Sequence, residues 1–429
     1  MKEKLAILGG EKSFNLEVDS YNSLGAEEVS AAQEVVKSGI LSQFLGEWDA
    51  DFYGGPKVKE FENNWSEFFK IKHSVSVNSC TSGLMVALGA IGLEPGDEVI
   101  VSPWTMSASA TSILVWNAIP VFADIEPETF NLDPISIEKN ITKYTKAIVV
   151  TNIFGHAAKL NEIMSIAQKY NLKVIEDNAQ APGAKYYEKF TGCVSDIGVF
   201  SLNYHKHIHT GEGGMCVTNN DVLAERMQLI RNHAESVIGG KGIKNLTNMI
   251  GFNFRMGEIE AAIGVEQLKK LTSIISEKIN WSNYISEGLV NLKGLKTPIV
   301  KENCSHVYYS YPMTIDNNIT GVHRDKIYQA LVAEGVPALG NSYVNLHLFP
   351  IYQNKIAYGS NGFPWSSDIY KGSVSYDKGI CPVAESMNDR IYLDLGVSHI
   401  KLNKEICDSI VESFKKVWRH IDLLNTKIK

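Results

Sequence analysis

One lysine of the chain lies where its amine can act as a nucleophile. Lys206 occupies a short polar segment between the apolar run Ile197–Ser201 and the glycine pair Gly213–Gly214. A lysine that is partly removed from water has a lowered pKa, and its neutral amine attacks carbonyl groups to form a Schiff base. Lys206 is therefore a candidate for covalent chemistry with an aldehyde or a ketone. The alternative for a single lysine is an ordinary position on the surface.

An aspartate occupies a matching place at the end of another apolar run. Asp177 closes the segment Val174–Asp177, upstream of Lys206. Pyridoxal phosphate requires a lysine that holds its aldehyde and a carboxylate that keeps its pyridine nitrogen protonated. Asp177 and Lys206 therefore predict a site for pyridoxal 5'-phosphate. For Asp177 alone, a turn or a helix cap is the alternative.

Three histidines around the lysine offer a competing interpretation. His205, His207 and His209 alternate along the chain, so an extended backbone would direct all three imidazoles to one face. Structural zinc usually needs a fourth ligand, and no pair of cysteines in CxxC spacing lies nearby. We therefore expect no metal and interpret the three histidines as polar loop residues.

Composition excludes several classes of partner. The 429 residues carry a net charge of −7, and no cluster of lysine and arginine provides a footprint for nucleic acid. No run approaches the roughly 18 apolar residues of a membrane helix, and the N-terminus shows no signal-peptide pattern. The 6 cysteines are scattered singly, which is typical of free thiols in a reducing cytosol. We expect a cytoplasmic protein that binds neither nucleic acid nor membrane.

Short β-branched runs alternate with helix-length segments in the first half of the chain. The predicted strands are Glu98–Val101, Pro120–Ala123, Ala147–Thr151, Lys173–Glu176, Ile197–Ser201 and Met215–Thr218. This alternation predicts an α/β fold with a mostly parallel sheet and helices on both faces. Ligands of such sheets bind beyond the carboxyl ends of the strands. Thr151, Asp177 and Ser201 all stand at these ends, so we expect them to converge.

Other segments flank this sheet. A helix is predicted from about 25 to 38, followed by an aromatic, glycine-rich loop at 43–56. The apolar face of the helix is expected to consist of Val29, Ala32, Val35 and Val36. After a further helix near Glu258–Leu271 the pattern changes to mixed helices and strands, which predicts a large cofactor domain over 1–275 and a smaller C-terminal α+β domain over 276–429.

A series of ordered motifs runs from about residue 54 to residue 385. They are Gly55-Pro-Lys-Val-Lys-Glu-Phe-Glu62, Val77-Asn-Ser-Cys-Thr-Ser-Gly83, Pro95-Gly-Asp-Glu-Val-Ile100, Val174-Ile-Glu-Asp-Asn-Ala-Gln-Ala181, Ser201 with Lys206 and Gly211-Glu-Gly-Gly214, Gly251-Phe-Asn-Phe-Arg-Met256 and Cys381-Pro-Val-Ala-Glu385. In this order they resemble the DegT/StrS family of sugar aminotransferases. The resemblance implies an aspartate-aminotransferase-like fold (fold type I) and transfer of an amino group from glutamate, or glutamine, to a sugar-like acceptor.

The resemblance implies roles around the cofactor ring. Lys206 would hold pyridoxal phosphate and move the proton between substrate and cofactor, Asp177 would pair with the pyridine nitrogen, and Gln180 would face the ring hydroxyl. The family usually stacks an aromatic residue on the ring. Here Met106 takes that place, with Trp104 close by, and we expect one of the two to cover the ring. Plain packing is the alternative for Met106.

The resemblance also implies a shared phosphate site. Cys80 and Thr81 lie in a turn that enters a helix starting near Ser82, where backbone N–H groups and the helix dipole favour a dianion. Cys80 replaces a glycine that is usual in the family. Ser201 would also bind the phosphate, and Asn253 would reach the phosphate of the neighbouring subunit. The active enzyme would therefore be a homodimer with shared sites.

Two residues are candidates for binding the acceptor. His347 matches a family histidine near the acceptor, and Arg231 has the side chain that grips a carboxylate with two hydrogen bonds. The alternatives are a structural histidine and an arginine paired with a nearby glutamate. One branch of the family has a histidine in place of the catalytic lysine and dehydrates sugars. In this sequence Lys206 occupies that position, which favours transamination.

The acceptor follows from the opening of the chain and from its length. The segment Leu5–Gly10 and the long chain resemble subgroups that act on free acceptors. The expected acceptor is a keto or aldehyde sugar acid such as 8-oxo-3-deoxy-octulosonate, in the biosynthesis of a lipopolysaccharide sugar. A nucleotide-linked keto-sugar or a cyclitol is the alternative, and a non-catalytic regulator that binds pyridoxal phosphate is a further one.

Overall fold

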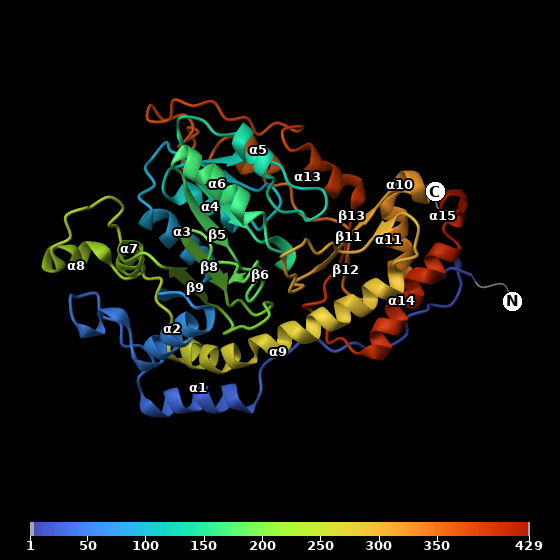
Figure 1. Cartoon of the computed structure of the whole chain (residues 1–429), viewed down its shortest axis with the longest axis horizontal. Coiled ribbons are helices and arrows are strands. Elements are labelled where there is room, and N and C mark those ends of the chain that lie inside the picture. Colours follow the sequence, from blue (N-terminus) through green and yellow to red (C-terminus); the bar gives the residue numbers. More distant parts are fainter. Residues whose placement is uncertain (1–3, 428–429) are drawn as a thin grey trace.

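A seven-stranded sheet forms the centre of the larger of two cores in the computed structural model, which describes residues 4–427 (Figure 1). In spatial order the strands are β1 (His73–Val77), β9 (Gly214–Thr218), β8 (Ile197–Ser201), β5 (Lys173–Asp177), β4 (Thr145–Thr151), β2 (Glu98–Val101) and β3 (Ile119–Phe122). The strands from β8 to β3 are parallel, and β9 runs antiparallel to both of its neighbours. The predicted mostly parallel sheet is confirmed, and β1 is an additional strand.

The strands of this sheet are covered on both faces. Every residue of β2, β3, β8 and β9 is buried, which explains their continuous apolar sequences. The helices of this part are α2 (Pro56–Phe69), α3 (Cys80–Ala90), α4 (Ala108–Val115), α5 (Pro134–Lys139), α6 (Leu160–Tyr170), α7 (Asp221–Arg231) and α8 (Ala234–Lys241). A small hairpin joins β6 (Lys185–Tyr186) to β7 (Lys189–Phe190). The sheet therefore presents only its strand ends to a ligand.

A four-stranded antiparallel sheet forms the second core. Its order is β10 (Leu295–Lys296), β11 (Tyr311–Ile315), β13 (Tyr392–Leu395) and β12 (Leu339–Gly340). The accompanying helices are α10 (Asn317–Thr320), α11 (Arg324–Ala333), α12 (Pro350–Gln353), α13 (Pro382–Ser386), α14 (Lys404–Arg419) and α15 (Leu423–Lys427). The predicted α+β character of the C-terminal part is confirmed.

One long helix, α9 (Glu258–Leu289), links the two cores and extends well beyond the predicted end at Leu271. It packs against α2 at Gly264, where only a glycine leaves room for Phe61, and against α14 near its other end. The helix runs through residue 275, so the predicted division into 1–275 and 276–429 does not describe these two cores.

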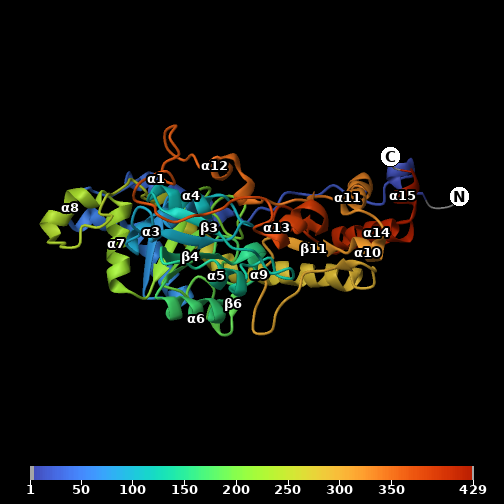
Figure 2. The same ribbon diagram turned by 90° about the horizontal axis from the view of Figure 1, so that it is seen from above.

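The chain also crosses between the cores elsewhere. Leu5 and Phe14 are buried in the smaller core, although the prediction placed them in the large domain. Conversely, Tyr352 and Tyr376 pack on the larger core. Figure 2 shows the start of the described chain on the same side of the molecule as α11 and α15, in agreement with this packing of the N-terminal segment.

Helix α1 (Ala26–Ser38) exposes much of the apolar face that the sequence predicted. Val35 is buried, but Val29 is 69% exposed and Val36 is 58% exposed. The helix instead contacts α9 through its polar side, where Glu28 accepts hydrogen bonds from Lys270 at 2.7 Å and from Gln267 at 2.8 Å. The periodicity correctly predicted a helix, but the apolar stripe faces away from its own chain.

No helix among residues 4–427 is both long enough and apolar enough to cross a membrane.

Candidate active site

A chain of hydroxyl groups holds Asp177 at the end of β5. Ser109 Oγ donates to Asp177 Oδ2 at 2.6 Å, and the Ala179 N–H donates to Oδ1 at 3.2 Å. Thr105 Oγ1 lies 3.1 Å from Ser109 Oγ and accepts from Thr151 Oγ1 at 3.2 Å. Burial raises the pKa of Asp177, and the hydrogen bond from Ser109 opposes the rise. Two of the predicted strand ends, those of β4 and β5, therefore meet here.

Lys206 lies in the loop after β8, withdrawn from solvent. Only 8% of its surface is exposed, and its Nζ lies 4.3 Å from the centroid of the Tyr309 ring. Within residues 4–427, its ammonium group has no carboxylate within ion-pair distance. Burial lowers the pKa of Lys206 to about 8, although Cys80 and Asp177 act in the opposite direction. The structure thus provides the desolvated amine that the sequence predicted.

The turn into α3 converges with the ends of β8 and β9. Ser79 caps α3 by accepting a hydrogen bond from the Ser82 N–H at 3.0 Å, so the N–H groups of Cys80 and Thr81 keep no acceptor among the described residues. Ser201 pairs with Gly214 in the β8–β9 ladder. A Cβ atom on Gly214 would lie 2.7 Å from the Ser79 carbonyl carbon, so only glycine permits this approach. The predicted phosphate-binding groups are therefore brought together.

Hydrogen bonds to both ends of its amide fix Gln180 beside this site. Its Oε1 accepts from the Phe154 N–H at 2.7 Å, and its Nε2 donates to the Tyr343 hydroxyl at 3.3 Å. Burial raises the pKa of Tyr343 to about 12, and Asp177 adds to the rise. Tyr343 and Ser109 were not predicted. The sequence offered one indication that Ser109 belongs to the site, its helical spacing of four residues from Thr105. It offered no such indication for Tyr343.

Trp104 packs in an aromatic core and leaves no ring face for a ligand. It is fully buried against Phe130, Tyr343 and Tyr392, with ring centroids 5.3–6.2 Å apart. The prediction that Trp104 covers a cofactor ring is therefore wrong. Met106 is 59% exposed, and its sulfur accepts from the Ala108 N–H at 3.1 Å. Its covering role stays a prediction.

Arg231 is fully buried and does not offer its guanidinium to a soluble molecule. Its Nη1 pairs with Glu62 at 2.6 Å and donates to the Ser76 carbonyl at 3.0 Å, while its guanidinium lies over the Phe44 ring. The acceptor-binding role predicted for Arg231 is wrong, because this ion pair fastens α7 to α2 and β1. The 43–56 loop likewise packs on its own chain, since Phe44 and Phe52 are buried.

Replacement of Arg231 by methionine is expected to lower the free energy of unfolding by about 3 kcal/mol, because Glu62 would lose the cation that compensates its burial. Chemical denaturation measures this change. The double variant with Glu62→Gln should lose less than the single variant. Folded Arg231→Met should keep its affinity for the acceptor; a raised KM for the acceptor at unchanged stability would restore the binding role.

His347 is also fully buried. Its Nε2 lies 2.9 Å from Glu385 Oε1, and the ring packs near Phe122. Burial lowers the pKa of His347, and Glu385 opposes the shift. His347 presents no atom to the surface, so the predicted contact with the acceptor is not supported. The alternative, a structural histidine, is supported.

The three alternating histidines have three different surroundings. His207 is buried and its Nε2 lies 2.7 Å from the Val307 carbonyl oxygen, whereas His209 Nδ1 accepts from the Gly211 N–H at 3.3 Å. His205 lies between Tyr309 and His399. Across residues 4–427, no group of three or more histidine, cysteine, aspartate or glutamate side chains is placed to hold a metal ion. The loop is not extended, so the alternation does not bring the imidazoles together.

Asn253 lies at the surface in the segment before α9. It is exposed, and its Oδ1 accepts from Arg255 Nε at 2.7 Å. The Asn232–Asn253 bridge ties this segment to the end of α7. The side chain thus points outward, as a contact with another subunit would require.

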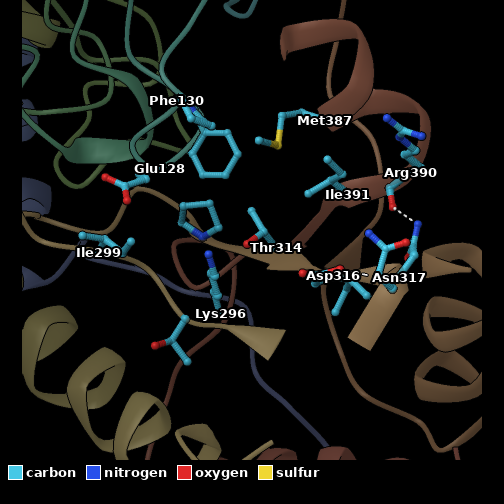
Figure 3. A pocket seen from close by; sticks show the side chains of 15 residues that line it. Glu128, Phe130, Lys296, Ile299, Thr314, Asp316, Asn317, Met387, Arg390 and Ile391 are labelled. Atoms are coloured by element: carbon cyan, nitrogen blue, oxygen red, sulfur yellow. Dashed lines mark hydrogen bonds between the residues drawn. The ribbon is translucent and has the colours of Figure 1, made fainter. Parts of the chain in front are cut away.

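A cavity of about 490 Å³ lies apart from these residues, between the loop after β3 and the smaller sheet (Figure 3). Phe130 and Met387 line it on one side, and Thr314 and Lys296 line it on the other. Phe130 and Tyr392 pack between this cavity and Trp104. None of the predicted cofactor residues lines the cavity, so we do not assign the chemistry to it.

Comparison with known proteins identifies the family. The model of the DegT/DnrJ/EryC1/StrS aminotransferase family matches residues 24–388. The chain belongs to this family. Its members are pyridoxal-phosphate-dependent enzymes, so this protein is a pyridoxal-phosphate-dependent aminotransferase, and the predicted family, enzyme class and cofactor are confirmed.

Individual relatives cover most of the chain. The GDP-perosamine synthase of Caulobacter vibrioides is 35% identical over 303 residues, which span 70% of this chain and 79% of that protein. The L-glutamine:2-deoxy-scyllo-inosose aminotransferase of Streptomyces lividus is 30% identical over 435 residues, which span 98% and 99%. The aminotransferase structure from Psychrobacter cryohalolentis has a TM-score of 0.81 at 27% identity, covering 95% of this chain and 100% of that one. The fold type I architecture is thereby confirmed.

The residues of the site fit pyridoxal 5'-phosphate. The N–H groups of Cys80 and Thr81 suit a phosphate, and Gly214 leaves space beside them. Lys206 supplies an amine without a competing carboxylate, and the Asp177 carboxyl is held by Ser109 on one oxygen. An aldehyde, a phosphate and a pyridine nitrogen each find the partner that their chemistry requires.

The lowered pKa of Lys206 makes the uptake of cofactor depend on pH. Only the neutral amine attacks the aldehyde, so its fraction, and the rate at which apoenzyme takes up pyridoxal phosphate, should rise with pH around a midpoint near 8, well below the ordinary 10.5. Stopped-flow absorbance between pH 6.5 and 9.5 measures this rate. A rate that is flat over this range would contradict the lowered pKa.

Proposed function

We propose that this aminotransferase transfers an amino group from glutamate to the carbonyl carbon of a free, polyhydroxylated acceptor, a sugar acid or a cyclitol. The convergence of Lys206, Asp177 and the α3 turn is the observation that carries the transaminase chemistry. The retained lysine argues against a non-catalytic regulator, since a regulator needs no group that moves protons. Glutamine is the alternative donor.

The residues divide the work of the reaction. Pyridoxal phosphate, when bound, supplies an electrophilic carbon and a ring that stabilises negative charge on the donor's α-carbon. Asp177 holds a proton on the pyridine nitrogen, and Ser109 keeps the carboxyl in place. Gln180, fixed by Phe154 and Tyr343, would face the ring hydroxyl. Lys206 Nζ would take the proton from the donor's α-carbon and deliver it to the carbon of the cofactor that carried the aldehyde.

The extent of similarity to one relative supports a free acceptor. The enzyme from Streptomyces lividus, named for a cyclitol ketone without a nucleotide, matches 98% of this chain and 99% of its own length. The GDP-perosamine synthase is matched over a smaller share of both chains. This difference supports a free acceptor. Within that class, 8-oxo-3-deoxy-octulosonate and a role in lipopolysaccharide biosynthesis stay the specific predictions, although the burial of Arg231 removes one argument for an acid.

A competition assay tests the acceptor. Purified enzyme with glutamate or glutamine receives equimolar 8-oxo-3-deoxy-octulosonate, 2-deoxy-scyllo-inosose and a GDP-linked 4-keto-sugar, and mass spectrometry measures each amine formed. We expect one of the free acceptors to be aminated faster than the nucleotide-linked sugar. Faster amination of the GDP-linked sugar would overturn the acceptor class and leave the aminotransferase assignment unaffected.

The proposed enzyme is a homodimer with shared active sites. Apolar side chains are exposed just before α1, along it and in the loop after it: Leu24, Val29, Val36, Ile40, Leu41, Leu45 and Trp48. Figure 1 shows α1 on the outer side of α9 with no further element beyond it. A stripe of this extent is typical of a contact surface, and the exposed Asn253 supports a site completed by the partner. All cysteines are free thiols, which supports a cytoplasmic location.

Mixing two inactive variants tests the shared sites. Lys206→Ala removes the amine, and Asn253→Asp would place a negative charge beside the partner's phosphate. In a mixed dimer one site has lost both groups and the other has kept both. After subunit exchange we expect activity to rise towards about one quarter of that of the wild type, since half of the dimers are hybrids and each keeps one intact site. Activity that stays at the level of the separate variants, or a fully active monomer in sedimentation, would contradict the proposal.

A further inference from the structure

Within one subunit, no arginine is placed at that subunit's own site to bind a carboxylate of the amino donor. Glutamate is a dicarboxylate, and such groups are most often bound through charge-assisted hydrogen bonds. Arg226, Arg231 and Arg324 are buried and donate to neighbouring backbone or side-chain groups. Arg255 contacts Asn253, Arg390 lines the separate cavity, and Arg419 pairs with Glu412 on α14. In the proposed dimer Arg255 would face the partner's site together with Asn253, so a subunit must bind the donor at its own site through other groups.

Two imidazoles lie near Lys206. The ring centroids of His205 and His399 are 6.0 Å apart, and His205 is 6.0 Å from the centroid of the Tyr309 ring, over which the Lys206 amine lies. His205 comes from the loop that carries Lys206, and His399 follows β13. Both rings are accessible, and none of their nitrogens has a hydrogen-bond partner among the described residues.

We propose that His205 and His399 together form the subsite that binds a carboxylate of the amino donor, an inference that rests on the proposed glutamate-dependent function. Each ring has an N–H group that can donate to a carboxylate oxygen. The two rings approach the site from different elements, so one carboxylate can accept from both while the donor's amine faces Lys206.

The electrostatics of the two rings agree with this role. Burial lowers the pKa of His205 to about 4, with smaller contributions from Lys206 and His399. Burial also lowers the pKa of His399, with contributions from Lys278 and Lys206. Without a ligand His205 is therefore neutral at pH 7, and His399 is harder to protonate than an ordinary imidazole. A carboxylate between them would favour their protonated forms, and each hydrogen bond would become charge-assisted.

The test uses the holoenzyme and the half-reaction with the donor alone. L-glutamate, or L-glutamine if that is the donor, is varied in single-turnover absorbance experiments. His205→Asn and His399→Asn keep a polar side chain but cannot become cationic, and each should raise the half-saturating donor concentration at least about tenfold. The limiting rate should change much less. His399→Arg should restore tight binding, and His73→Asn, in a surface pair with Asp221, is the matched control.

Competition with glutarate and its neutral diamide, glutaramide, separates binding from structural damage. The wild type should bind glutarate more tightly than glutaramide, and the asparagine variants should lose this difference. Misfolding would instead weaken the binding of both competitors. An unchanged half-saturating donor concentration in both variants would overturn the proposal. If Arg255→Gln raised that concentration instead, the arginine of the partner subunit would bind the carboxylate. A wild type that reacts with neither donor would refute the proposed function itself, and the subsite with it.

Discussion

Replacement of Lys206 by alanine is expected to abolish transamination, with a loss of at least about a thousand-fold in kcat. The amine both holds the cofactor and moves the proton, and no other lysine is predicted at the end of β8. The fold should persist, because the variant removes a buried charge that has no carboxylate partner. Steady-state assays with glutamate and far-UV circular dichroism measure the two effects.

Lys278 provides the matched control for this experiment. Among the described residues it is the other lysine whose pKa burial lowers to about 8. It lies on α9 against the Tyr21 ring and donates to the Val397 carbonyl. Lys278→Met should keep kcat within about threefold. Near-normal transamination by the Lys206→Ala variant would contradict the assignment of Lys206 to the active site.

Replacement of Asp177 by asparagine is expected to lower kcat by about a hundred-fold or more. An amide of the same shape cannot hold a proton on the pyridine nitrogen by charge, so the ring loses its ability to stabilise the carbanion. Single-turnover kinetics with glutamate measure the loss. The cofactor should still bind, because the α3 turn and Lys206 are unaffected.

Ser109→Ala tests how the carboxyl of Asp177 is positioned. The hydroxyl donates to Asp177 Oδ2 at 2.6 Å, so its removal should lower kcat by about tenfold while the charge remains. The effects of Ser109→Ala and Asp177→Asn should be non-additive in the double variant, because the two residues act through one carboxylate. Additive losses would show that Ser109 acts through something else.

The sequence predicted the parts of the site that depend on local pattern. Asp177, Ser201 and Thr151 stand where apolar runs end, and parallel strands bring such ends to one edge. The helix predicted to follow the turn at Cys80 and Thr81 is also present, but it begins at Cys80, two residues before the expected start near Ser82. Lys206 could be placed because polar residues on both sides mark a loop after a buried strand.

Tertiary packing decided what the sequence could not. Arg231 and His347 have side chains that suit an anion, but their exposure depends on Glu62 and Glu385, which are distant in sequence. Val29 and Val36 form an apolar stripe that faces outward, because a pattern predicts a buried face without saying which chain buries it. The division of the cores failed for a similar reason, since α9 continues where a boundary was expected.

Reduction with borohydride followed by peptide mapping tests the central claim most directly. The reagent makes the bond between lysine and pyridoxal phosphate permanent, and mass spectrometry locates the modified residue. We expect the phosphopyridoxyl group on Lys206 in nearly every chain, and its loss when saturating glutamate is added before reduction. A label on Lys278 or another lysine, or no label on protein that transaminates, would contradict the account.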